Sequence, residues 1–308
     1  MSYFERALQL AERGRGKVED HPLVGAVVVA DGEVVGEGWY EYARVDHAEP
    51  IALAQAGDRA RGATLYVTLE PCAHHGKTPP CADAVIAAGI ARVVVGALDP
   101  NPKAAGGIER MRAAGIDDEL LDSPEARRQN EAWRTWVARG RPFVTLKLAV
   151  TLDGRVAVPG RRWVTGEESR RRVHELRAAS DAVAVGMGTV RADDPGLDAR
   201  GVGATRQPRR IAFGHGPSKL EVRSGPLEDE LRALAAEGVQ SLLLEGGPTI
   251  AQSFLQAGLV DKIVLFVAPV LAGQGVCAFG DVQFELEGIT MTPIGDDLEI
   301  VGYLPGLA

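Results

Sequence analysis

The chain has 308 residues, of which 45% are apolar and 25% are charged, proportions typical of folded globular proteins that exclude disordered and fibrous classes. Its formal net charge of −8 opposes nucleic-acid binding, because a phosphate backbone is repelled at long range. No apolar run is long enough to span a membrane, and the first residues predict an amphipathic helix and not a secretory leader. We therefore expect a cytoplasmic protein with a small-molecule substrate and neither nucleic acid nor membrane as partner.

The first half of the chain alternates helical and β-branched segments, which predicts an α/β layer fold. Helices are predicted at 4–13, 47–55, 81–88 and 106–114, and strands at 24–29, 34–38, 64–68 and 92–96. The pair Asp31-Gly32 predicts a hairpin between the first two strands. A last helix over 123–139 ends before Gly140-Arg141-Pro142, where we place a boundary between domains 1–141 and 142–308.

A second α/β series follows this boundary. Strands are predicted at 143–150, 182–185, 210–213, 241–244, 262–267 and 298–303, and helices at 167–179, 227–237 and 249–257. The segment 201–226, rich in Gly, Pro and Arg, predicts mainly loop.

The most specific pattern is His47-Ala48-Glu49 followed by Pro71-Cys72 and then by Cys81. One imidazole and two thiolates leave the fourth tetrahedral position of zinc open, as in catalytic zinc sites. Glu49 is not a ligand and can carry a proton from water to a leaving amine. Either half of this pattern alone could be chance or core residues, but the complete order matches the zinc-deaminase signature. The third cysteine, Cys277, has no such neighbours and is predicted to be a buried apolar residue.

The loop between the two cysteines carries His74, His75 and Lys77. It could be an ordinary solvated loop. Because metal ligands would hold both of its ends, we favour a cradle for an anionic substrate group, with the Lys77 ammonium as a point charge for phosphate.

Longer stretches in both halves allow comparison with known families. In the first half they are His47-Ala48-Glu49, Thr68-Leu69-Glu70-Pro71-Cys72, His74-His75-Gly76-Lys77-Thr78-Pro79-Pro80-Cys81 and Asp99-Pro100-Asn101-Pro102. In the second half they include Lys147-Leu148-Ala149, Leu152-Asp153-Gly154-Arg155, Trp163-Val164-Thr165-Gly166, Gly188-Thr189-Val190, Ala192-Asp193-Asp194-Pro195 and Glu245-Gly246-Gly247-Pro248-Thr249. Over nearly its whole length the chain resembles the bifunctional riboflavin-biosynthesis deaminase/reductase family, RibD.

The resemblance implies a three-layer cytidine-deaminase-like domain followed by a dihydrofolate-reductase-like α/β domain. It implies zinc-dependent hydrolytic deamination of 2,5-diamino-6-(5-phosphoribosylamino)pyrimidin-4(3H)-one. NADPH-dependent reduction of the ribosyl group would then give 5-amino-6-(5-phosphoribitylamino)uracil. We further expect a homodimer or homotetramer.

The resemblance also implies roles for individual residues at matching positions. In the first domain the zinc ligands would be His47, Cys72 and Cys81, the proton shuttle Glu49, and a substrate phosphate contact Lys77. In the second domain the substrate-pocket residues would be Lys147, Trp163, Arg177, Asp193 and Arg200, and the residues near the dinucleotide Thr165, Thr189, Glu245, Gly246 and Gly247.

Two of the chain's departures from the family pattern bear on ligand binding. His21 occupies a position where an amide is expected to bind substrate, and an imidazole offers fewer hydrogen bonds there. The stretch 201–226 is shorter than usual, which favours weaker NADPH binding, although Arg206, Arg209 and Arg210 could hold the 2′-phosphate there.

Three other readings remain open from the residues themselves. The second half could be an inactive or structural reductase-like domain beside a working deaminase, since 245–249 could be a plain strand-to-helix turn. The zinc fold could also serve nucleic-acid editing, which the acidic charge disfavours. A non-catalytic zinc-stabilised protein is disfavoured by Glu49 beside an open metal position.

Overall fold

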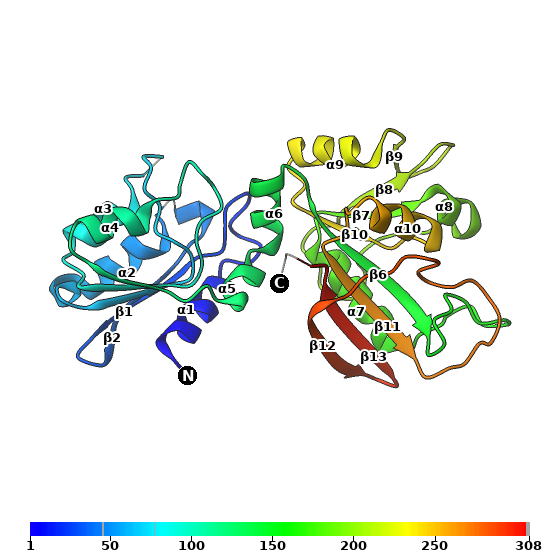
Figure 1. Cartoon of the computed structure of the whole chain (residues 1–308), viewed down its shortest axis with the longest axis horizontal. Coiled ribbons are helices and arrows are strands. Elements are labelled where there is room, and N and C mark those ends of the chain that lie inside the picture. The colour runs from blue at the N-terminus through cyan, green and yellow to red at the C-terminus, as the bar shows by residue number, and fades with distance from the viewer. Residues whose placement is uncertain (45, 77, 306–308) are drawn as a thin grey trace. The chain divides into compact units, whose positions relative to one another are not determined.

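The computed structural model describes residues 1–44, 46–76 and 78–305. The chain divides into two compact units, Met1–Arg139 and Gly140–Ala308 (Figure 1). No helix among the described residues is both long enough and apolar enough to cross a bilayer.

A five-stranded sheet forms the middle of the N-terminal unit, with the order β2-β1-β3-β4-β5. The strands are β1 (Gly25–Ala30), β2 (Glu33–Trp39), β3 (Thr64–Val67), β4 (Arg92–Val95) and β5 (Asp117–Leu120). β1 pairs antiparallel with β2 and β3, whereas β3, β4 and β5 run parallel. The predicted hairpin is confirmed, because Asp31 and Gly32 adopt φ values of 51° and 78° between β1 and β2.

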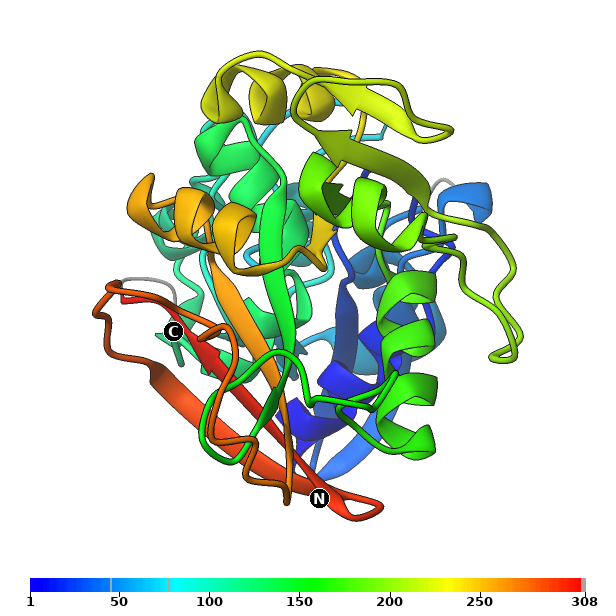
Figure 2. The same ribbon diagram turned by 90° about the vertical axis from the view of Figure 1, so that its right-hand side faces the viewer.

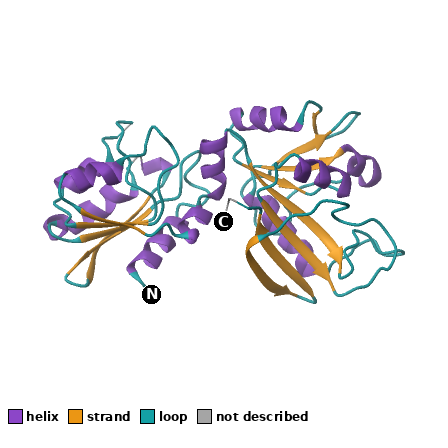
Figure 3. Cartoon of the chain, in the orientation of Figure 1, coloured by secondary structure: helices purple, strands orange, loops and turns teal. Residues whose placement is uncertain are grey.

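Helices cover both faces of this sheet, which gives the predicted three layers (Figure 3). The helices are α1 (Tyr3–Glu12), α2 (Ala48–Ala56), α3 (Cys81–Ala87), α4 (Gly107–Ala113), α5 (Pro124–Gln129) and α6 (Glu131–Arg139), with short 3₁₀ turns η1 (Tyr42–Arg44) and η2 (Gly57–Ala60). Ala7 and Leu10 of α1 pack on one face, and α2, α3 and α4 pack on the other. Gly38 permits close approach of α2, since a Cβ there would lie 2.1 Å from the carbonyl oxygen of Ala48.

An eight-stranded sheet forms the middle of the C-terminal unit, with the order β12-β13-β11-β6-β10-β7-β8-β9. The strands are β6 (Phe143–Thr151), β7 (Ala182–Gly186), β8 (Arg209–Phe213), β9 (Glu221–Arg223), β10 (Ser241–Leu244), β11 (Lys262–Ala268), β12 (Glu287–Ile294) and β13 (Asp297–Tyr303). β6 to β11 run parallel, and β13 pairs antiparallel with both β11 and β12. The β12-β13 hairpin is seen in red at the sheet edge in Figure 2.

The helices of this unit are α7 (Glu167–Ala179), α8 (Met187–Asp193), α9 (Leu227–Ala236) and α10 (Pro248–Gln256). Alternating strand residues separate the core into two layers. One side packs against α9 and α10 through Leu231 and Phe254, and the other packs against α7 through Val173. The mixed α/β architecture predicted for each domain is confirmed.

The sequence analysis did not predict the strands β5, β9 and β12 or the short helix α8. The helix predicted over 123–139 is two helices that meet at Asn130. The segment 201–226, predicted to be mainly loop, contains the strands β8 and β9. The prediction for Cys277 was wrong, since this cysteine is exposed.

Candidate active site and zinc centre

Three side chains of the N-terminal unit converge where two helices begin. His47 immediately precedes α2, Cys81 is the first residue of α3, and Cys72 lies on the loop after β3. The Nδ1 atom of His47 is 3.2 Å from the Cys81 sulfur and 3.7 Å from the Cys72 sulfur. The three ligand atoms all lie within 4.8 Å of one another.

This arrangement fits zinc. A tetrahedral zinc with ligand bonds of about 2.0–2.3 Å separates its ligand atoms by roughly 3.5 Å, close to the separations found between His47 and the two sulfurs. The Cys81 N–H at the start of α3 also points at the Cys72 sulfur, 3.4 Å away. Hydrogen bonding from Cys81 and then from His47 holds the pKa of the Cys72 thiol well below its usual range, which favours the thiolate that a metal binds.

Glu49 lies in the first turn of α2, two residues from His47, and only 3% of it is exposed. Burial raises the pKa of this carboxyl group to about 7. Its Oε2 atom has no hydrogen-bond partner within the described part of the chain. A carboxyl group with a pKa near neutrality and a free oxygen can both accept and release a proton.

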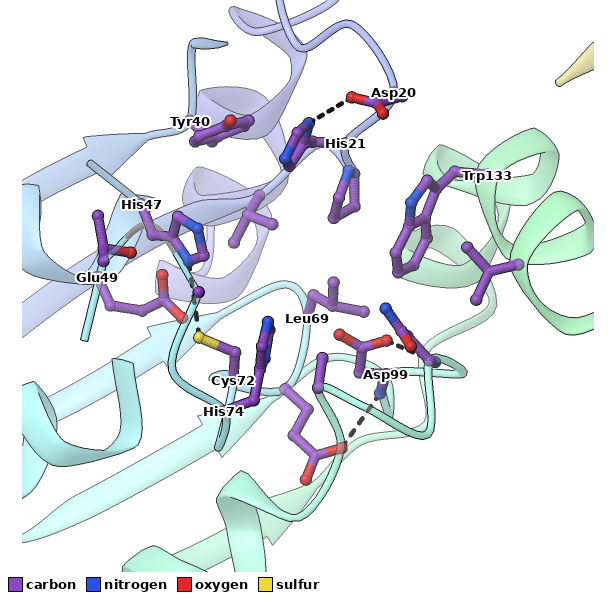
Figure 4. Close-up of a pocket in the computed structure, with 18 of the residues that line it drawn as sticks. Asp20, His21, Tyr40, His47, Glu49, Leu69, Cys72, His74, Asp99 and Trp133 are labelled. Carbon is purple, nitrogen blue, oxygen red and sulfur yellow. Dashed lines mark hydrogen bonds and ion pairs between the residues drawn. The ribbon is translucent and has the colours of Figure 1, made fainter. Parts of the chain in front are cut away.

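A cavity of about 450 Å³ opens beside these residues (Figure 4). His47, Glu49 and Cys72 form part of its wall, and His74 from the loop between the cysteines adds to it. The volume suits a small organic ligand.

His21 lines the cavity, as the sequence predicted for a substrate-contacting position. Its Nδ1 atom lies 2.8 Å from Oδ1 of Asp20. Its ring centroid is 5.4 Å from that of Tyr40, which in turn contacts the His47 ring edge-on at 5.5 Å. Lys77, the predicted phosphate contact, lies outside the described residues.

Several residues that line the cavity were missed by sequence reasoning: Asp20, Tyr40, Asp99, Asn101 and Trp133. Burial raises the pKa of Asp99 to about 6. The stretch Asp99-Pro100-Asn101-Pro102 was conspicuous in the sequence, but no spacing rule connected it to the metal site. Trp133 lies on a predicted helix and belongs to none of the motifs quoted from the sequence.

Glu70 fixes the loop that carries Asp99 to the segment that carries Cys72. This carboxylate is buried and accepts N–H groups from Gly106 at 3.0 Å, Ile108 at 3.1 Å and Asp99 at 3.2 Å. These three N–H donors satisfy the oxygens of the buried carboxylate. The two loops are therefore positioned together beneath the cavity.

Some of the candidate reductase residues follow the carboxyl ends of parallel strands, where open α/β sheets bind ligands: Thr189 follows β7, and Glu245, Gly246 and Gly247 follow β10. Arg177 of α7 and Glu245 after β10 form a two-point ion pair, with distances of 2.5 and 2.9 Å. Lys147 of β6 lies near both charges, and burial lowers its pKa. Arg177 also donates to the carbonyl oxygen of Asp198 at 3.0 Å. The largely exposed Arg200 pairs with the Asp198 carboxylate at 2.7 Å.

Gly246 and Gly247 join β10 to α10, and Gly247 is the N-cap of that helix. The Gly247 N–H donates to Oγ1 of Thr189 in α8 at 3.4 Å, so the predicted cofactor residues of two segments are adjacent. A Cβ at Gly246 would lie 1.8 Å from Cγ2 of Ile250, which explains the need for glycine there.

The remaining candidates, Trp163, Thr165 and Asp193, lie on the loop before α7 and at the end of α8. Trp163 is 53% exposed, and the Arg162 and Arg170 guanidinium groups lie over its ring, 5.0 and 5.5 Å from the ring centroid. Arg170 also donates to the Thr165 carbonyl at 2.7 Å. Asp193 is the exposed last residue of α8.

The structure contradicts the proposed 2′-phosphate contacts. Arg209 is the first residue of β8 and aligns with Ala182 at the amino end of β7, whereas Gly186 and the glycine turn lie at the carboxyl ends. Arg206 pairs with Asp181 at 2.5 Å, and Arg209 pairs with Glu221 and Glu237. These arginines lie at the amino ends of the strands, opposite the end that carries the glycine turn.

Comparison with known proteins accounts for both units. Residues 1–97 match the cytidine and deoxycytidylate deaminase zinc-binding region, and residues 142–299 match the RibD C-terminal domain. The riboflavin biosynthesis protein RibD of Aquifex aeolicus is 41% identical, over 91% of this chain and 89% of that protein. The Escherichia coli protein of the same name is 39% identical, over 89% of this chain and 90% of that protein. The chain belongs to the RibD family.

Solved structures of RibD proteins agree with this assignment. The Acinetobacter baumannii RibD structure has a TM-score of 0.84 and 34% identity, and covers 98% of each chain. A Thermotoga maritima structure described as a diaminohydroxyphosphoribosylaminopyrimidine deaminase/5-amino-6-(5-phosphoribosylamino)uracil reductase has a TM-score of 0.81 and 34% identity, over 98% of this chain and 97% of that one. The predicted RibD resemblance is confirmed.

We expect Cys81→Ala in this RibD-family chain to lose bound zinc and to destabilise the N-terminal unit, because two ligands cannot replace three around the metal. Elemental analysis of the purified variant measures the loss. Cys277→Ala is the matched control, since that cysteine is exposed and belongs to the other unit. Full zinc content in Cys81→Ala would show that Cys81 is not a ligand.

Proposed function

We propose that this chain catalyses two successive reactions of riboflavin biosynthesis. Residues 1–141 would deaminate 2,5-diamino-6-(5-phosphoribosylamino)pyrimidin-4(3H)-one by hydrolysis. Residues 142–308 would then reduce the ribosyl group with NADPH to give 5-amino-6-(5-phosphoribitylamino)uracil. The observation that carries the proposal is the open three-ligand site beside buried Glu49 in a cavity of substrate size.

His47, Cys72 and Cys81 would hold zinc, and Glu49 would transfer protons as general base and general acid. Zinc, when bound, lowers the pKa of water and supplies a hydroxide nucleophile at neutral pH. Glu49 accepts the proton from water at its free oxygen and later delivers it to the departing amine, so that ammonia leaves. His21, Tyr40 and Asp99 surround the space for the pyrimidine and orient it.

In the C-terminal unit, the Gly247 N–H and the Thr189 hydroxyl would face the cofactor phosphates at the start of α10. Lys147 and the Arg177–Glu245 pair would contact the ribosyl phosphate substrate beside them. NADPH would supply the hydride. Glu245 stays a predicted dinucleotide residue, and its carboxylate also pairs with Arg177, a predicted substrate residue.

We propose a cytoplasmic enzyme that acts on a phosphorylated pyrimidine as a homodimer or homotetramer. Gel filtration with light scattering would measure the assembly directly.

Titration with NADPH tests the reductase assignment. We expect NADPH to bind and Thr189→Val to weaken binding about tenfold, since the hydroxyl would be lost at the glycine turn. Arg209→Ala is the control and should leave the affinity for NADPH unchanged, because Arg209 lies at the amino end of β8, away from the glycine turn. If NADPH does not bind even at about millimolar concentration, the chain is a deaminase with a reductase-like structural half.

Lys77→Ala tests the predicted phosphate contact. The residues on either side, Gly76 and Thr78, line the cavity. We expect KM for the phosphorylated substrate to rise by the equivalent of about 1–3 kcal/mol, with little change for a dephosphorylated analogue. Equal increases for both substrates would assign Lys77 to a solvated loop.

A further inference from the structure

Asn130 makes an unusual pair of hydrogen bonds across the N-terminal unit. It lies at the junction of α5 and α6, and only 4% of it is exposed. The Leu23 N–H donates to its Oδ1 at 2.8 Å, and its Nδ2 donates to the Leu23 carbonyl at 2.9 Å. An amide is suited to this role, because it offers a donor and an acceptor side by side.

Both segments joined by this amide line the cavity. His21, Pro22 and Val24 flank Leu23, while Trp133 and Trp136 follow Asn130 on α6. Figure 4 shows His21 and Trp133 bordering the pocket from these two segments. Asn130 itself is not among the described residues that line the cavity. It therefore acts on the pocket through its neighbours.

We propose that Asn130 is a positioning residue for substrate binding in the deaminase. Its two bonds fix the main chain of the His21 segment against α6, so that His21 and Trp133 keep a defined separation across the pocket. This inference rests on the proposed deaminase function. It predicts an effect on substrate affinity in a residue that neither touches substrate nor binds metal.

Asn130→Asp tests the pair with little change in volume. The carboxylate can still accept the Leu23 N–H, but its second oxygen would face the Leu23 carbonyl oxygen and repel it. We expect KM for deamination to rise about tenfold with kcat changed less than about twofold, the pattern of lost ground-state positioning. Zinc content and reduction of separately supplied deaminated substrate should stay unchanged.

Asn130→Ala removes both bonds without adding charge and should give the same pattern. Gln129→Ala is the matched control. The neighbouring Gln129 also donates its amide to main chain, but to the Leu8 carbonyl of α1 at 2.9 Å, so KM should stay at the wild-type value. In a His21→Ala background, Asn130→Asp should raise KM much less than in wild type, because the positioned side chain is already gone.

The outcomes separate the two proposals. Wild-type protein that contains zinc but releases no ammonia would overturn the proposed function. An active wild type with unchanged KM in both Asn130 variants would overturn only the positioning role. Loss of zinc from both variants, with reduction by the C-terminal unit intact, would make Asn130 a folding residue and would also overturn it. A full KM increase in the His21→Ala background would do the same.

Discussion

Glu49→Gln is expected to abolish deamination and to leave zinc in place. Glutamine keeps the shape of the side chain but cannot accept the proton of water or deliver it to the amine. Loss of a general acid and base of this kind costs about 10²–10⁴ in kcat. Because Glu49 is buried and not one of the three ligand groups, the metal and the fold should be retained.

Ammonia release and zinc content, measured on the same sample, check this expectation. Glu109→Gln is the control, since that exposed glutamate lies on α4 and away from the cavity lining. Reduction of deaminated substrate by the C-terminal unit gives an internal measure of folded protein. Deamination at the wild-type rate in Glu49→Gln would exclude Glu49 as the proton carrier.

Arg141→Met is expected to destabilise the C-terminal unit more than any surface substitution. Arg141 forms a two-point ion pair with Asp261, with distances of 2.6 and 2.7 Å. The Asp261 side chain is fully buried and also accepts the Val144 N–H at 2.8 Å. Methionine would leave this carboxylate charged and unpaired by arginine, which costs about 3–5 kcal/mol.

Urea unfolding, monitored with a probe in the C-terminal unit, measures the change in the free energy of unfolding. Arg206→Met is the matched control, because its ion pair with Asp181 is 59% exposed on the arginine side and should contribute at most about 1 kcal/mol. Similar small losses in both variants would show that the buried pair is not a main anchor of β6.

The sequence predicted the metal site well because its chemistry is local and specific. His47, Cys72 and Cys81 each belong to short motifs, and their residue types permit few alternatives to zinc. The rest of the pocket depends on tertiary structure. Tyr40 and Trp133 come from segments with no motif, and only folding brings them to the cavity of Glu49.

The errors have physical causes. Arg209 and Arg210 follow the loop that was expected to border the cofactor. The parallel pairing of β7 and β8 instead places them at the amino ends of the strands, opposite the glycine turn. The exposed edge strand β5 was missed because its sequence, Asp-Asp-Glu-Leu, has no alternating apolar pattern. The edge strand β12 alternates Ile289 and Met291 with threonine, but Gly288 and Pro293 argue against a strand there. Local sequence does not reveal which strands pair or whether they pair in parallel.

Zinc-dependent deamination by the N-terminal unit can be tested directly. The most direct measurement is ammonia release from the diaminopyrimidinone ribosyl phosphate by the whole chain without NADPH, before and after removal of zinc by a chelator. We predict that ammonia is released with zinc bound, stops when zinc is removed, and resumes when zinc is restored. Ammonia release that persists without zinc, or none from zinc-loaded protein, would contradict the account.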